Sequence, residues 1–161
     1  VSPVKPLWII LVKTIPYLVL STANICSILL LSYFVLDVPV KGSVPLLIGG
    51  SLIFTVTALS LGMFVSSIAH TQTVAMFGTL VGLFLPSLMF SDFMFPVDNM
   101  PEPLRILSYA LPSRWYFYIV KSVMIKGLGL EGIWKELLIL SGMTLVLLFV
   151  SIRKFDNRLA L

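Results

Sequence analysis

Residues that could support catalysis are few in this chain and stand far apart. It has one histidine, His70, in a short polar connection, and one cysteine, Cys26, in an apolar run. General acid–base chemistry would have to use Asp92, Asp98 or Glu102, and the sequence displays no partner for any of them. No cluster of metal-ligating residues, nucleophile motif or phosphate-binding glycine loop is present. We therefore expect no enzymatic activity, no metal and no cofactor.

The composition points to a membrane protein. Of the 161 residues, 58% are hydrophobic and 11% are charged, and the mean hydropathy is +1.06. About 25% charged residues is usual in soluble domains. The net charge of +4 is small and the basic residues are scattered, so nucleic acid is not an expected partner. The chain begins with Val1 and no signal peptide precedes its apolar runs, so we expect it to be the C-terminal part of a longer protein.

Four apolar stretches are long enough to cross a bilayer, which takes about 20 helical residues. The predicted fold is therefore an all-α integral membrane protein with four transmembrane helices and two short re-entrant or interfacial helices before the last. The predicted spans are residues 12–36, 44–69, 73–93 and 131–152, with an outer cap over 94–130.

Residues 94–130 are too polar to cross a membrane and too apolar for a solvated loop. Four aromatic residues, 115–118, form one block of the kind found at membrane–water boundaries. Pro101 suits the first position of a short helix, and we expect Pro112 to end that helix. Ser113 is then expected to cap a second helix of about 20 Å, which Gly127 terminates.

Small and polar residues at helical spacing predict where the spans pack. Gly78 and Gly82 form a G-x-x-x-G helix-contact motif, and Pro86 should kink the same span. In the second span the expected packing stripe consists of Ser51, Thr55, Ala58, Gly62 and Ser66. In the first span, Tyr17, Ser21, Asn24 and Ser27 share one face. That face is suited either to hydrogen bonding between helices or to a transport path.

An even number of spans places both ends of the chain on the same side of the membrane. Lys and Arg residues number five on the side of the ends and six on the other, so the charge distribution does not choose the side.

Several motifs resemble the C-terminal half of type-2 ABC exporter permeases, in a branch connected with drug export. They are F-P-V-D-N-M-P-E-P-L-R at 95–105, L-S-Y-A-L-P at 107–112, M-I-K-G at 124–127 and, near the start, S-P-V-K-P at 2–6 and K-T-I-P-Y at 13–17. The resemblance extends over essentially the whole chain.

The resemblance implies a permease subunit of six spans, of which this chain would hold the last four. It further implies a bacterial cytoplasmic membrane, both chain ends in the cytoplasm, a second permease subunit in a homo- or heterodimer, and a separate ATP-binding cassette ATPase that binds the ATP. By position, Ser2 and Pro3 would lie near the ATPase-coupling region, and Gly78 and Gly82 near the dimer interface. The residues expected to shape the outer re-entrant cap or gate are Pro96, Met100, Pro101 and Pro112.

The function expected from the resemblance is export of a drug-like or lipid-like substrate by alternating access. Two alternatives remain open from the residues alone. A secondary transporter or channel would usually carry ionisable residues within its spans, whereas here they cluster at the span ends. A non-transporting membrane scaffold would explain the packing motifs equally well.

Overall fold

The computed structural model describes residues 6–38 and 40–159, and all regular structure in those ranges is helical. Three long helices are α1 (Pro6–Phe34), α2 (Val44–Ile68) and α7 (Leu130–Leu159). A fourth is continuous through three segments, α3 (Gln72–Thr79), the π-helix η1 (Leu80–Phe84) and α4 (Leu85–Phe90). The short elements are the 3-10 turn η2 (Val97–Asn99), α5 (Glu102–Tyr109) and α6 (Pro112–Met124).

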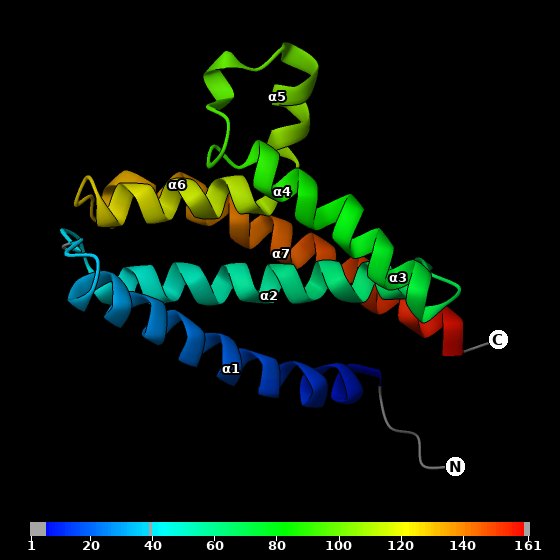
Figure 1. The fold of residues 1–161 in the computed structure, drawn as a ribbon. Coiled ribbons are helices and arrows are strands. Elements are labelled where there is room, and N and C mark those ends of the chain that lie inside the picture. The colour runs from blue at the N-terminus through cyan, green and yellow to red at the C-terminus, as the bar shows by residue number, and fades with distance from the viewer. Residues whose placement is uncertain (1–5, 39, 160–161) are drawn as a thin grey trace.

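Four helical stretches are long and apolar enough to cross a membrane: Thr14–Phe34, Val44–Ile68, Gln72–Phe90 and Leu130–Lys154. The predicted fold class, four candidate membrane helices with two short helices before the last, is confirmed. The two ends of the described chain lie at the same end of the bundle (Figure 1). The α1–α2 turn and the α6–α7 turn lie together at the other end, where the Lys41 N–H donates to the Met124 carbonyl over 3.2 Å.

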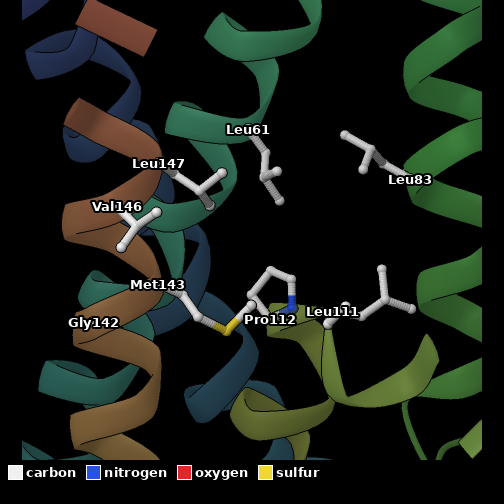
Figure 2. A pocket seen from close by; sticks show the side chains of 9 residues that line it. Leu61, Leu83, Leu111, Pro112, Gly142, Met143, Val146 and Leu147 are labelled. Carbon is white, nitrogen blue, oxygen red and sulfur yellow. The ribbon is translucent and has the colours of Figure 1, made fainter. Parts of the chain in front are cut away.

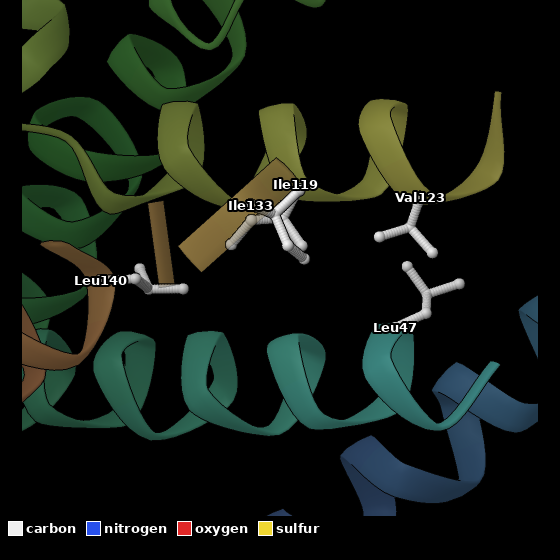
Figure 3. Close-up of a cluster of buried hydrophobic side chains, with 5 residues drawn as sticks. All are labelled: Leu47, Ile119, Val123, Ile133 and Leu140. Atoms are coloured by element: carbon white, nitrogen blue, oxygen red, sulfur yellow. The ribbon is translucent and has the colours of Figure 1, made fainter. Parts of the chain in front are cut away.

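The core is built by α2, α6 and α7. Figure 3 shows Ile119 and Val123 pointing from α6 toward α2, where Leu47 meets them, and Ile133 and Leu140 complete the cluster from α7. All five are almost inaccessible to solvent. The short helix α6 is therefore part of the packed interior and does not lie across the end of the bundle.

Hydroxyl groups tie α2 to α7 along the rest of their contact. Thr57 and Thr144 share a hydrogen bond, and the Ser151 hydroxyl donates to the Ser60 carbonyl over 3.1 Å. Such bonds hold helices together where burial from water supplies no driving force. The packing stripe predicted for the second span was wrong in part: Ser51 is buried, but Ala58 and Ser66 are exposed. The buried small residues of α2 are Gly50, Ser51, Thr57, Ser60 and Ser67.

The local signals at the short helices were placed correctly in one case and wrongly in three. Pro101, expected at the first helical position, is the cap residue of α5, which begins at Glu102. Gly127 has φ +67°, the left-handed conformation expected of a residue that ends a helix. Pro112 does not end α5, which stops at Tyr109; it is the first residue of α6. Ser113 consequently lies inside the first turn of α6, and Leu111 occupies the cap position. Proline fits the first helical position because it lacks an N–H and its φ is already helical.

The third candidate span contains a π-helical turn that the sequence analysis did not anticipate. The Leu85 N–H donates to the Leu80 carbonyl, five residues back, just before Pro86. Proline cannot donate to the carbonyl four residues earlier, so the helix must change its bonding near this residue. We attribute the wide turn to that requirement, because π-turns and prolines are recognised causes of helix distortion.

Candidate functional site

Helix α6 penetrates the bundle from the end that holds the α1–α2 turn. Its last residue, Met124, contacts Lys41 in that turn, and its first, Pro112, lines a cavity with Met143, about 20 Å along α7 from Leu130. Arg114 lies about 15 Å along α6 from Met124. A charged side chain at such a depth in a membrane helix bundle is costly and is a functional candidate by default.

The Arg114 side chain fastens the last turn of α5 to the first turn of α6. Its guanidinium carbon lies 3.8 Å from the centre of the Tyr109 ring, a cation–π contact. One guanidinium nitrogen donates to the Ser108 hydroxyl, which itself donates to the Arg105 carbonyl over 2.7 Å. Ser108 is fully buried, so its hydroxyl needs these partners.

Trp115 makes a second connection between the same two turns. Its indole N–H donates to the Tyr109 carbonyl over 3.1 Å, one of the carbonyls left without a helical partner at the end of α5. Leu111, between the helices, and Pro112, the first residue of α6, are buried. The break between α5 and α6, residues 110–111, is thus held in a defined conformation.

A polar cavity of about 340 Å³ lies on one side of this break. Its charged lining residues are Asp92, Asp98, Arg114 and Glu136, which come from four separate segments. Four aromatic residues, Tyr109, Trp115, Phe117 and Tyr118, and one aliphatic residue, Val97, complete the lining. Cavities of this size that combine apolar walls with a few polar groups are the usual form of small-molecule sites.

An apolar cavity of about 310 Å³ lies on the other side. Figure 2 shows the Pro112 ring at its base and Leu83, from η1, across the opening from Leu147 of α7. Leu61 of α2 and Met143 of α7 add to the lining. The break therefore separates two small spaces of opposite polarity.

An ion pair joins the end of the third candidate span to α6. The Lys121 ammonium lies 3.4 Å from one carboxylate oxygen of Asp92, whose other oxygen accepts the Val97 N–H over 3.0 Å. Asp92 has φ +69°, so the chain turns sharply at this residue. The structure places Asp92 at the polar cavity.

The predicted cap residues occupy different environments. Pro112 lies in the apolar cavity and is buried. Pro96 and Pro101 are exposed and Met100 is half-buried, all in the connection from α4 to α5. Ser2 and Pro3, expected near the ATPase-coupling region, lie outside the described residues.

Gly78 and Gly82 face away from the packed interior. A methyl group at Gly78 would meet only Val65 of α2, at 3.7 Å, and one at Gly82 would meet nothing within 4 Å. No residue of Gln72–Phe90 is buried. Within the part of the chain that the structure describes, this face of the span is open.

Arg114 is the residue that sequence reasoning missed. No role could be assigned to it from the sequence, because the sequence of a 13-residue helix does not show which of its ends lies deep in the bundle. One signal was available: Arg114 stands two residues after Pro112 and directly before Trp115. A proline at a helix start, followed at once by an arginine and an aromatic ring, is consistent with a held corner.

Comparison with known proteins places the chain in a family. Residues 1–125 match the model described as "ABC-2 type transporter". The chain is 34% identical over 119 residues to the "Probable multidrug ABC transporter permease YbhS" of Escherichia coli K12, covering 74% of this chain and 32% of that protein. It is 28% identical over 137 residues to "Probable multidrug ABC transporter permease YbhR", with 85% and 37% covered.

A third relative, the "Inner membrane transport permease YhhJ" of E. coli K12, is 29% identical over 142 residues, with 87% and 37% covered. No solved structure matches. The chain spans about a third of the length of the curated relatives it matches. The family match covers more than three quarters of the chain, so this chain belongs to the ABC-2 type transporter family.

Proposed function

We propose that this chain is the C-terminal transmembrane part of a permease subunit that exports a drug-like or lipid-like substrate. Transport would be driven by a separate ATP-binding cassette ATPase, with a second permease subunit completing a homo- or heterodimer. The protein would lie in the bacterial cytoplasmic membrane, with both ends of the chain in the cytoplasm. Family membership and the printed names of the relatives support this proposal.

The observation that carries the proposal is the buried corner between α5 and α6. Helix α6 is too short to cross a membrane and holds Arg114 at its deep end. A helix with a purely structural role would not need a charge at that depth, because burying the charge costs free energy. Interrupted helices with polar groups at their deep ends are a recurrent way to build transporter sites. The cavities beside the corner provide space for a substrate next to it.

We propose that this arrangement works by alternating access. The α2–α7 pair forms the packed frame, and α6 is fixed to it through Ile119 and Val123. The third candidate span has no buried residue and would move relative to that frame. ATP-driven movement at the cytoplasmic end would rock the third span, which is joined to α6 by the Asp92–Lys121 pair. The outer cavities would then open as the inner side closes.

The experiment is a coupled ATPase assay on the full-length protein. The permease that contains this chain is purified with its co-expressed candidate ATPase and reconstituted in liposomes, and vanadate-sensitive ATP hydrolysis is measured with and without candidate substrates. Hydrolysis that requires both proteins and changes with a substrate is the expected result.

Two outcomes would overturn the proposal. Substrate movement that persists without any ATPase would indicate a secondary transporter or channel. A folded, inserted protein that associates with no ATPase and moves no substrate would indicate a membrane scaffold.

A further inference from the structure

We propose that the polar cavity beside the α5–α6 break binds an apolar organic cation. This inference rests on the proposed export function and names the class of substrate that the site would take.

The charges around the polar cavity favour a cation. Of its three carboxylates, Asp92 is compensated by Lys121, whereas Asp98 and Glu136 have no ion-pair partner among the described residues. The only basic residue in the lining is Arg114. Two uncompensated carboxylates against one guanidinium leave the cavity with a net negative charge, and a positively charged ligand would restore the balance.

The guanidinium of Arg114 is engaged by other residues and is not free to bind a ligand in this cavity. It stacks on Tyr109 and donates to Ser108, so it is directed toward α5. An anionic ligand would have to compete with these contacts and approach two carboxylates. A cationic ligand would not need Arg114 and would be attracted by Asp98 and Glu136.

The aromatic lining supplies the second type of contact that organic cations use. Ring faces attract ammonium and guanidinium groups, and the attraction grows as water is excluded. The rings here already demonstrate the preference, because the Lys126 ammonium lies 5.6 Å from the centre of the Tyr118 ring. Phe117, whose side chain contacts Phe93 edge to face, has no cation over its ring in the described chain.

Two probes of the same shape and opposite charge test this directly. Binding of radiolabelled tetraphenylphosphonium and of tetraphenylborate is measured on the purified full-length permease without nucleotide. We expect saturable binding of the phosphonium and no saturable binding of the borate. The double variant Asp98→Asn/Glu136→Gln should weaken phosphonium binding about tenfold, since it removes both uncompensated charges.

The matched control is Glu102→Gln, which removes an exposed carboxylate at the start of α5 that does not line the cavity. It should bind the phosphonium as the parent protein does. If the double variant does not fold, Phe117→Leu provides an independent test, because it removes the lining ring that holds no cation in the described chain and keeps every charge of the lining. We expect about fivefold weaker binding from that variant.

The outcomes separate this inference from the proposed function. Preferred binding of the borate, no binding of the phosphonium by folded protein, or equal weakening by Glu102→Gln would each overturn the cation site. Substrate-independent coupling to the ATPase is measured on the same preparations. Intact coupling without phosphonium binding rejects only the cation site, and phosphonium binding without any ATPase coupling rejects only the ATP-driven mechanism.

Discussion

At the scale of single residues, Arg114 is the side chain most closely connected with the proposed function. Its contacts with Tyr109 and Ser108 join two helices at a point where the backbone makes no helical hydrogen bonds between them. A guanidinium is suited to this role because it can stack on a ring and donate in its own plane simultaneously.

We predict that Arg114→Gln loosens α5 without unfolding the bundle. Loss of one charge-assisted hydrogen bond and one cation–π contact should destabilise the corner by about 1–2 kcal/mol. Backbone hydrogen exchange in Glu102–Tyr109 should then be about tenfold faster, as measured by mass spectrometry on the full-length protein in detergent. Arg105→Gln, on α5 but outside these side-chain contacts, is the control. Equal acceleration in both variants would refute the role of Arg114.

Gly42 illustrates a residue whose importance is purely steric. A methyl group there would come within 2.5 Å of the Val123 carbonyl oxygen, so the α1–α2 turn would have to separate from α6. Gly42→Ala should therefore lower stability by about 1–3 kcal/mol, seen as a lower thermal midpoint in detergent. Gly49→Ala is the matched control, because a methyl group at Gly49 meets nothing within 4 Å. A midpoint no lower than that of the control would contradict the predicted clash.

At the scale of elements, periodicity and composition were enough to predict which helices exist. The four long apolar stretches and two short helices all appear, since each depends on local signals such as an apolar run, a proline or Gly127. It was harder to predict which side of each helix packs against its neighbours. In α2 several interleaved sets of small residues satisfy the same spacing, and only the position of α6 and α7 decides that Gly50, Thr57 and Ser60 are the buried ones.

The depth of α6 could not be predicted for a related reason. The helix carries two basic residues and four aromatic ones, a composition that fits a membrane surface as well as a buried corner. The decision depends on partners distant in sequence: Ile119 and Val123 find Leu47 and Leu140, and Arg114 finds Ser108 and Tyr109. The π-turn η1 was not predicted, because Pro86 indicates that the helix is distorted but does not indicate which kind of distortion forms.

The two prolines at the starts of the short helices should differ in importance. Pro112 is buried in the apolar cavity, and alanine there would add an N–H with no polar lining residue to accept it. Pro101 is exposed, so water can satisfy the new donor. We predict that Pro112→Ala reduces export several-fold with little loss of membrane insertion, whereas Pro101→Ala changes export much less. Export from whole cells and the amount of protein in the membrane fraction are the measurements. Equal loss of export and insertion in Pro112→Ala would count against a gating role.

At the scale of the whole molecule, the described chain has a packed half and an open half. Burial is concentrated on α2, α6 and α7, while Gln72–Phe90 has no buried residue and Thr14–Phe34 has only Ser32. Helices of both kinds are equally apolar, so hydropathy did not distinguish them. Because the chain spans about a third of its relatives, the open faces are where the rest of the protein, a second subunit or lipid would lie.

The face containing Gly78 and Gly82 is the one that we assign to a second permease subunit. Glycines at this spacing let helix backbones approach closely, and within the described chain nothing covers Gly82. With Cys26 replaced by alanine, Gly82→Cys should form a disulfide between two subunits when the membranes are oxidised, read as a dimer band that reductant removes. Leu138→Cys, on an exposed face of α7, should stay monomeric. A dimer band from Leu138→Cys and none from Gly82→Cys would move the subunit interface to α7, and the third span would then face lipid or the upstream spans instead.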